Sequence, residues 1–300
     1  MLNLPQNVTI VGSGTQGSML AFRSAAFGRK VCLYDLSADQ LTGAMEKIKG
    51  WFGDWVDQGK LSPDTAAAAY QSMRTATDLA DALKDCDIII ENVPEILTLK
   101  QSVWKELDQA APPHTLLTTN SSSLKASDIG AFIDRKDKTF NINFMTPTTD
   151  DLVEVMWNQY TSEETKEAAL DFLTAQDNVP IITQKEIKGF SLNRVWRAIK
   201  KESLKLWAEG YITPEDFDRA WILEWGTPHG PFGLMDKVGL DIVEQIELTY
   251  YDESQDPNDR PPQALREMIE KGWLGEKTGR GFYEYPDPAY SRPGWLKGRK

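Results

Sequence analysis

The chain has 300 residues, 41% of them hydrophobic, which is enough for two domains with separate cores. Its 33 Lys and Arg against 45 Asp and Glu give a formal charge of −12, which disfavours binding to nucleic acid and to anionic membranes. No apolar run is long enough to span a membrane, and no signal-peptide pattern opens the chain. Cys32 and Cys86 lie in apolar runs, as buried reduced thiols do, so we expect a cytoplasmic protein.

The first predicted element is a β-branched strand at residues 7–11, and the glycine-rich turn GSGTQG follows it. Its glycines allow a tight turn, a close approach of phosphate to bare backbone, and close contact between strand and helix. An Ala-rich helical stretch comes next, and its N-terminus favours negative charge. The residues of this turn that we predict to bind a dinucleotide are Gly12, Gly14, Thr15, Gln16 and Gly17.

The second predicted strand covers residues 30–35 and ends at an acid. Asp35 lies 18 residues beyond Gly17, close to the spacing at which a carboxylate binds the adenosine ribose. An acid at this place favours NAD, because a 2′-phosphate would face its charge. The alternative is a simple glycine turn followed by a surface aspartate. The order of strand, glycines, helix, strand and acid favours the nucleotide site.

Two more short buried strands are predicted within residues 86–95 and 115–123, each after a helical segment. Repeated strand–helix units predict a doubly wound parallel sheet, which binds ligands beyond the carboxyl ends of its strands. The polar residues predicted at that edge are Glu91, Asn92, Glu95, Asn120, Ser121, Ser122 and Ser123. Turn and helix-capping chemistry is the alternative explanation for each of them.

Residues 45–83 read as a helical insertion between the second and third strands. Lys47, Lys49 and Lys60 could meet a phosphorylated tail there, although solvated lysines on a helix are the favoured explanation. After Lys185 the pattern becomes helical throughout. We therefore expect an α/β sheet domain at residues 1–184 and an all-α domain at residues 185–300, with the boundary near 183–189.

The sequence resembles the L-3-hydroxyacyl-CoA dehydrogenase family along nearly its whole length. The segments that carry the resemblance, in the family's order, are VGSGTQGSMLA, ENVPEILTLKQSVWKELD, TTNSSSL, PTTDDLVEV, KGFSLNRVWRAIKKES, GTPHGPFGLMDKVGLDIV and GEKTGRGFYEY. The resemblance implies a Rossmann-type NAD-binding domain followed by a helical substrate and dimerisation domain.

The resemblance also implies roles for individual residues. Glu95 and Lys100 would lie along the cofactor, in addition to the glycine turn and its ribose-binding acid. Ser122 and Asn193 match positions that hydrogen-bond the substrate oxygen. Glu154 of LVEV matches the carboxylate that orients a catalytic histidine, which opens the family's H-F-x-N-P segment.

The corresponding segment here reads N-F-M-T-P, with Asn143 in place of the histidine and Thr146 in place of the second asparagine. A register without a gap places Ile142 there instead. Neither residue takes up a proton as imidazole does, so general base catalysis by the family's route is impaired. Losing such a base costs on the order of 10²- to 10⁴-fold in rate when nothing replaces it.

Three residues are candidates for the replacement base. Lys188 lies shortly before Asn193, and a partly buried lysine can have a lowered pKa. His229 lies in a loop that, by the family resemblance, approaches the substrate, and Glu154 in its apolar frame could itself accept the proton. The remaining alternative is a chain that binds NAD and a ligand but oxidises poorly.

The leading hypothesis is an NAD-dependent oxidoreductase that interconverts a 3-hydroxyacyl substrate, as a coenzyme A thioester or a related hydroxy acid, with its 3-keto form. The family resemblance implies a homodimer. An NAD-binding sensor or structural protein, and a non-redox enzyme on the same fold, are the alternatives. No metal site is predicted, because the two histidines and two cysteines lack ligand spacing.

Overall fold

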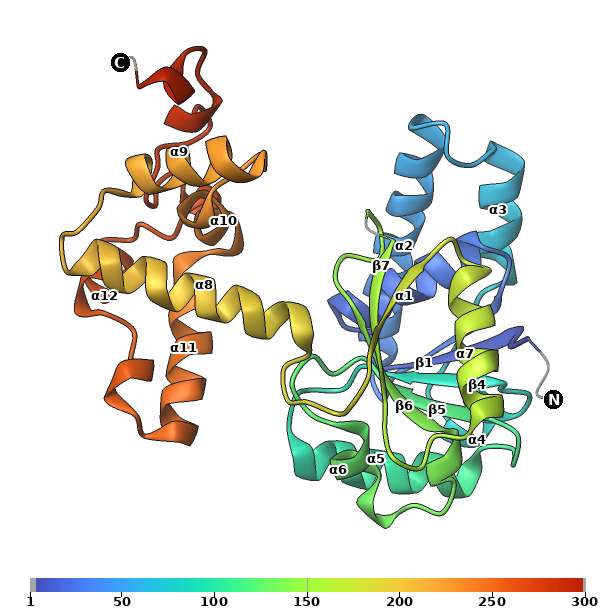
Figure 1. Ribbon diagram of the computed structural model, residues 1–300. Coiled ribbons are helices and arrows are strands. Elements are labelled where there is room, and N and C mark those ends of the chain that lie inside the picture. Colours follow the sequence, from blue (N-terminus) through green and yellow to red (C-terminus); the bar gives the residue numbers. More distant parts are fainter. Residues whose placement is uncertain (1–3, 150, 299–300) are drawn as a thin grey trace. The chain divides into compact units, whose positions relative to one another are not determined.

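The computed structural model describes residues 4–149 and 151–298, so Asp150 of the segment PTTDDLVEV lies outside the described residues. The chain divides into two compact units, Met1–Ser191 and Leu192–Lys300 (Figure 1). The described part of the chain contains no helix with the length and apolar character needed to cross a membrane.

The first unit is built on one eight-stranded sheet with the order β3-β2-β1-β4-β5-β6-β7-β8. Its strands are β1 (Asn7–Val11), β2 (Lys30–Tyr34), β3 (Arg74–Ala76), β4 (Ile88–Glu91), β5 (Leu116–Thr119), β6 (Thr139–Phe144), β7 (Leu152–Trp157) and β8 (Val179–Thr183). All neighbouring strands pair in parallel except β6 and β7, which are antiparallel. The predicted doubly wound sheet is therefore confirmed, with one reversed pair near its edge.

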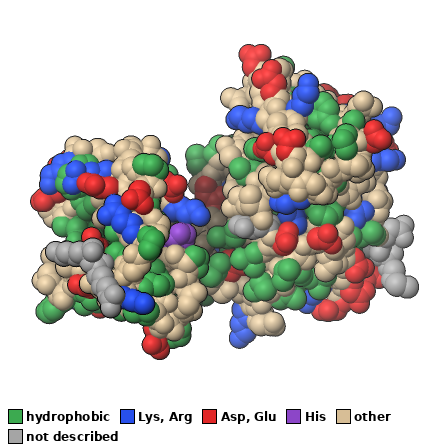
Figure 2. All heavy atoms as spheres, turned by 90° about the horizontal axis from the view of Figure 1, so that it is seen from above, with side chains coloured by type: hydrophobic (Ala, Val, Ile, Leu, Met, Phe, Trp, Pro, Cys, Tyr) green, Lys and Arg blue, Asp and Glu red, His purple; other side chains and the backbone are tan. Residues whose placement is uncertain are grey.

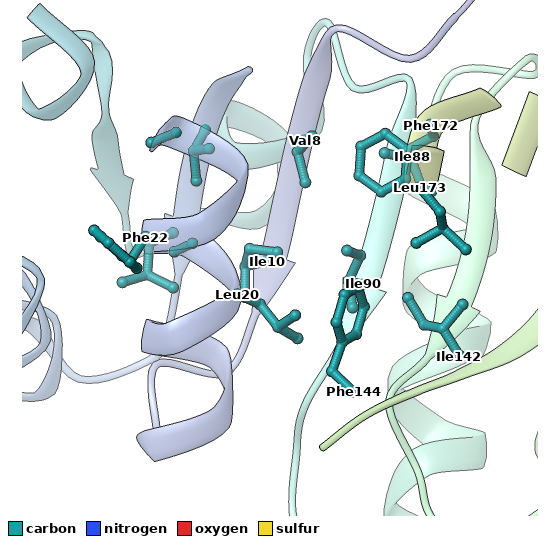
Figure 3. Close-up of a cluster of buried hydrophobic side chains, with 14 of the residues drawn as sticks. Val8, Ile10, Leu20, Phe22, Ile88, Ile90, Ile142, Phe144, Phe172 and Leu173 are labelled. Atoms are coloured by element: carbon teal, nitrogen blue, oxygen red, sulfur yellow. The ribbon is translucent and has the colours of Figure 1, made fainter. Parts of the chain in front are cut away.

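Helices cover both faces of this sheet, and each face has its own hydrophobic cluster. One cluster includes side chains of α1 (Thr15–Ala26), α2 (Ala38–Asp57), α3 (Pro63–Ser72) and α7 (Glu163–Thr174). The other includes side chains of α4 (Leu79–Leu83), α5 (Leu97–Ala110) and α6 (Ala126–Ile129). Successive strand residues alternate between the clusters, so Ile10 and Ile90 belong to the first (Figure 3), while Val11 and Ile89 belong to the second. Burial on both faces explains the continuous apolar runs in the sequence.

The segment predicted as a helical insertion, residues 45–83, also contains a strand. Its first helix begins earlier, at Ala38, because the Ser37 hydroxyl accepts a hydrogen bond from the Gln40 amide and caps the helix. The prediction of an uninterrupted helical stretch was wrong at β3, which pairs with the end of β2. Three residues are too few to show a strand period in the sequence.

The second unit is helical, as predicted. It contains α9 (Pro214–Trp225), α10 (Pro231–Val238), α11 (Leu240–Ser254), α12 (Gln263–Glu270) and most of α8 (Ser191–Ala208). Thr213 caps α9, and Pro214 follows at its first position. Gly239, with a φ of 101°, separates α10 from α11. Short 3-10 helices of this unit cover Pro257–Asp259, Glu276–Thr278, Ala289–Ser291 and Trp295–Lys297. Two others, Gly130–Phe132 and Lys136–Lys138, belong to the first unit.

A buried carboxylate holds the C-terminal segment of the second unit against α10. Asp236 accepts hydrogen bonds from the amides of Phe282 and Tyr283, both at 2.9 Å, and from the Tyr285 hydroxyl at 3.1 Å. Burial outweighs these bonds and raises the pKa of Asp236 to about 6. The packing of this unit is therefore linked to the protonation of one acid.

Candidate functional site

The glycine turn between β1 and α1 is shaped by contacts that exclude side chains. Gly12 has a φ of 97°, and a Cβ atom there would lie 2.8 Å from the Asn92 carbonyl oxygen. A Cβ on Gly17 would lie 1.9 Å from the Gly12 carbonyl oxygen. A Cβ on Gly14 would meet no atom within 4 Å. Gly12 and Gly17 are thus needed for the packing of the protein itself, whereas Gly14 leaves open space above the backbone.

Asp35 follows β2 and is bonded to this turn. Its Oδ2 accepts hydrogen bonds from both the amide and the hydroxyl of Ser13, each at 2.8 Å, and its Oδ1 accepts one from the Ser37 amide at 3.1 Å. Burial alone would raise the pKa of Asp35, but the bonds from Ser13 and Ser37 outweigh it, and the pKa is lowered. A carboxylate has about four acceptor sites, so this anion has capacity for a further hydroxyl donor.

A cavity of about 600 Å³ opens beside the glycine turn and Asp35. Its lining includes Gly12, Gly14 and Asp35, and most of the remaining lining residues are apolar. The apolar residues include Leu36, Leu79, Val93, Leu99 and Val103. A largely apolar cavity with a few convergent polar groups is typical of a cofactor site, and these walls fit a flat aromatic base.

Lys100, predicted to lie along a cofactor, is directed into the protein, with 1% of its surface exposed. Its ammonium group pairs with Glu91 at 2.7 Å and with Glu95 at 3.3 Å, and it donates a hydrogen bond to the Val93 carbonyl oxygen at 3.0 Å. Glu91 is equally buried, so each charge offsets the desolvation of the other. Through these contacts Lys100 supports the loop after β4 and, by way of Glu95, the loop after β5.

Glu95 connects those two loops. Its Oε1 accepts hydrogen bonds from the hydroxyls of Ser121 and Ser123, the latter at 2.6 Å. Burial alone would raise the pKa of Glu95, but these hydroxyls and the Lys100 ammonium group outweigh it, and the pKa is lowered. Ser122, between the two bonded serines, is exposed. Glu95 thus holds the serines on either side of the one predicted to meet substrate.

The antiparallel pair β6–β7 brings Asn143 and Glu154 directly opposite each other. Asn143 is 4% exposed and Glu154 1% exposed. The Asn143 amide nitrogen donates to Glu154 Oε2 at 3.2 Å, and the Ser191 hydroxyl donates to Glu154 Oε1 at 2.7 Å. A buried carboxylate is therefore bonded to an amide on one oxygen and to a hydroxyl on the other.

An unusual turn places Ser191 beside Glu154. Gly189 has a φ of 81° and Phe190 a φ of 52°, and Phe190 is 0% exposed. A bulky residue rarely adopts a positive φ, and such a conformation persists only where packing enforces it. Burial of the Phe190 ring supplies that packing. The Ser191 residue itself is exposed, although its hydroxyl reaches a buried acid.

The other predicted site residues are distributed over both units. Lys188 is half-buried in the segment before α8, and Gln16 donates a weak hydrogen bond to the Met145 carbonyl oxygen at 3.4 Å. Thr15 is the exposed first residue of α1. Asn193 and His229 belong to the second unit.

His229 lies in the loop before α10. Its ring packs edge-on against Tyr290, with ring centroids 5.4 Å apart. Burial, followed by the nearby Lys237 charge, lowers the pKa of His229, so its imidazole is neutral at neutral pH. Among the described residues, no three or more His, Cys, Asp and Glu side chains are grouped as metal ligands.

Sequence reasoning missed two residues at these sites. Ser13, the variable residue inside the glycine motif, makes two of the bonds that hold Asp35. Ser191, inside GFSLNR, bonds to Glu154. Serine is common at the start of a helix, so the second residue gave no distinct signal in the sequence. No sequence pattern revealed the first.

Comparisons with known proteins agree over both units. Residues 7–187 match the model of the 3-hydroxyacyl-CoA dehydrogenase NAD binding domain, and residues 189–285 match that of the 3-hydroxyacyl-CoA dehydrogenase C-terminal domain. A probable 3-hydroxybutyryl-CoA dehydrogenase of Bacillus subtilis is 31% identical over 285 residues, which cover 94% of this chain and 98% of that protein.

Two solved structures are also similar. The (S)-3-hydroxybutyryl-CoA dehydrogenase of Ralstonia eutropha has a TM-score of 0.84 at 30% identity, covering 94% of this chain and all of that one. A diketoreductase, described as acting on dicarbonyl compounds, has a TM-score of 0.86 at 33% identity with the same coverage.

Proposed function

Because the chain belongs to the 3-hydroxyacyl-CoA dehydrogenase family, we propose that it interconverts a 3-hydroxyacyl substrate and its 3-keto form by NAD-dependent hydride transfer. The family match over both units carries this proposal. The chain is an oxidoreductase with a Rossmann-type domain, and NAD is its cofactor. The residue roles and the substrate named below are proposals.

The residues at the glycine turn fit a dinucleotide. Space above Gly14 admits a diphosphate to the backbone at the N-terminus of α1, where the helix dipole favours anions. Asp35 has acceptor capacity left for a ribose hydroxyl, and the apolar cavity walls suit the adenine ring. NAD supplies the hydride acceptor, C4 of its nicotinamide ring.

The chain's own residues would position the substrate and manage its proton. Glu95 fixes the serines around Ser122, whose exposed hydroxyl would bond the substrate oxygen. Asn193 would bond the same oxygen from α8. Asn143 cannot act as a base, so the proton must reach another group. Lys188, His229 and Glu154 remain the candidates from the sequence.

Acyl-CoA thioesters and simpler hydroxy acids are both candidate substrates. The names of the Bacillus and Ralstonia proteins favour 3-hydroxybutyryl-CoA. The diketoreductase is described instead by its catalysis of dicarbonyl compounds. We place the 3-hydroxyacyl-CoA first, because several of the similar proteins carry names of hydroxyacyl-CoA or 3-hydroxybutyryl-CoA dehydrogenases.

The test supplies NADH with acetoacetyl-CoA, with acetoacetate or with a diketone, in separate assays. The consumption of NADH is measured by its absorbance. Turnover of any of them supports a dehydrogenase, and the ratio of kcat/KM values assigns the substrate class. NADH binding without turnover on all three would instead favour the alternative, a cofactor-binding protein that lacks dehydrogenase activity.

We also propose a homodimer formed through the second unit and a cytoplasmic location. Tyr211, Leu223 and Trp225 of that unit are large, apolar and exposed. Charged side chains of both signs are interspersed with apolar ones over the surface in view (Figure 2). Light scattering should give twice the chain mass, and Trp225→Glu should reduce it to one chain. Fractionation of the native host would test the location.

A further inference from the structure

The environment of Glu154 determines where a proton can enter or leave it. The carboxylate is 1% exposed and lies in the middle of β7, opposite Asn143 of β6. Its bonds to Asn143 and Ser191 end on side chains of different chemistry. Each of these two bonds can serve as a proton route to Glu154 only if the bonded group can both give and take a proton.

An amide and a hydroxyl differ in this respect. The Asn143 amide nitrogen donates its hydrogens but has no basic lone pair, so it cannot pass a proton onward. A serine hydroxyl has one donated hydrogen and two acceptor lone pairs, so it can accept one proton while giving up another. Of these two, only the Ser191 hydroxyl can relay a proton to Glu154.

The geometry orients that hydroxyl for such a relay. Ser191 donates its hydrogen to Glu154 Oε1 at 2.7 Å, which directs the acceptor lone pairs of Oγ away from the carboxylate. The residue is exposed, whereas Glu154 is not. The Gly189–Phe190 turn, held by the buried Phe190 ring, places Ser191 beside Glu154.

We propose that Ser191 is a catalytic residue, whose hydroxyl relays the substrate proton to Glu154 in place of an imidazole. This inference rests on the proposed function. Glu154 is one of the three residues predicted from the sequence as a replacement base. The relay gives it a path for the proton from the substrate, through Ser191, which the sequence analysis did not predict.

The step balances in the direction of oxidation. The substrate C3–H bond breaks, and its electron pair leaves with hydrogen for C4 of the nicotinamide. The substrate O–H bond breaks, and its proton bonds to Ser191 Oγ as the Ser191 hydrogen bonds to Glu154 Oε1. The products are the ketone, NADH and a protonated Glu154, which returns its proton to solvent through Ser191. Reduction runs the same steps in reverse.

A pair of variants matched in shape tests the relay. Ser191→Thr keeps the hydroxyl, and Ser191→Val has the same branched shape without it. Removing a proton-transfer group costs about 10²- to 10⁴-fold, so kcat of Ser191→Val should fall at least ~100-fold, and Ser191→Thr should stay within about tenfold of the parent. The Kd for NADH should be unchanged in both variants. Ser291→Ala removes an exposed hydroxyl bonded to the Pro288 carbonyl oxygen and is the control.

A double variant provides a second readout that a structural role would not produce. When two residues act in one relay, removing both costs about as much as removing one. Glu154→Gln with Ser191→Val should therefore have the same kcat as the slower single variant. Multiplied losses in the double variant would overturn the relay.

The outcomes separate this inference from the proposed function. A parent enzyme that turns over while Ser191→Val matches it would overturn the relay and leave the dehydrogenase intact. Equal kcat losses in Ser191→Val and Ser191→Thr would also overturn it. A parent chain that binds NADH and turns over no substrate would overturn the proposed function, and the relay with it.

Discussion

Substitutions of Gly17 and of Gly14, both at the start of α1, should have different effects. The first should lower folding stability, and the second should weaken cofactor binding. A Cβ on Gly17 would lie 1.9 Å from the Gly12 carbonyl oxygen, while ordinary contacts begin at 3.4 Å, so helix and turn must move apart by about 1.5 Å. Overpacking of this kind costs about 1–3 kcal/mol or more, and Ala recovers at most about 1 kcal/mol of helix propensity. Gly17→Ala should therefore lose about 2 kcal/mol, or about 4–8 °C in Tm for a unit of this size.

Gly14→Ala should behave in the opposite way. A Cβ there meets no atom within 4 Å, and the φ of −61° suits any residue, so stability should change by less than about 1 kcal/mol. The methyl group would occupy the space proposed for the diphosphate, raising the Kd for NADH at least tenfold, or about 1.4 kcal/mol. Tryptophan fluorescence titration and thermal unfolding measure the two effects. Gly43→Ala, on the open side of α2, is the control.

Either of two results would refute this reasoning. Unchanged NADH affinity in Gly14→Ala would mean that no diphosphate approaches this backbone. Unchanged stability in Gly17→Ala would mean that the close contact between helix and turn does not exist.

Three other perturbations follow from buried charges and a helix cap. Lys100→Met should lower the free energy of unfolding by about 3–5 kcal/mol, as measured by urea titration, because it leaves the buried charge of Glu91 without its partner. The control is Lys125→Met, at a surface ion pair, which should lower it by less than about 1 kcal/mol. Between pH 4 and 6 the folded state retains a proton on Asp236 that the unfolded state has lost, so stability should fall as pH rises through this window, and Asp236→Asn should flatten the slope in calorimetry. Thr213→Ala should cost about 1 kcal/mol by removing the cap of α9, and an unchanged Tm would contradict the capping bond.

The parallel core of the sheet could be predicted from the sequence because its strands are short apolar runs that end in polar residues. The strands at 7–11 and 30–35 match β1 and β2 to within one residue. The reversal between β6 and β7 could not be predicted in this way. Strands buried on both faces have no alternating pattern, and the segment between these two does not carry a standard hairpin motif.

The site was predictable where one residue type alone meets a geometric need. Gly12 must allow a φ of 97° beside the Asn92 carbonyl oxygen, and glycine does so without strain. The Ser191–Glu154 bond depends on a turn in which Phe190 has a positive φ, a conformation that propensity argues against. Tertiary packing decides such a turn, so the sequence alone does not show it.

The contact between the Gly12 carbonyl and the start of α1 has a consequence for the energetics of recognition. It is made between backbone atoms of the protein, so the entropy of ordering this loop is lost when the chain folds and not when a ligand docks. Preorganisation of this kind predicts rapid, single-phase association at this end of the dinucleotide. It also predicts that amide hydrogens in the loop exchange slowly in the protein alone.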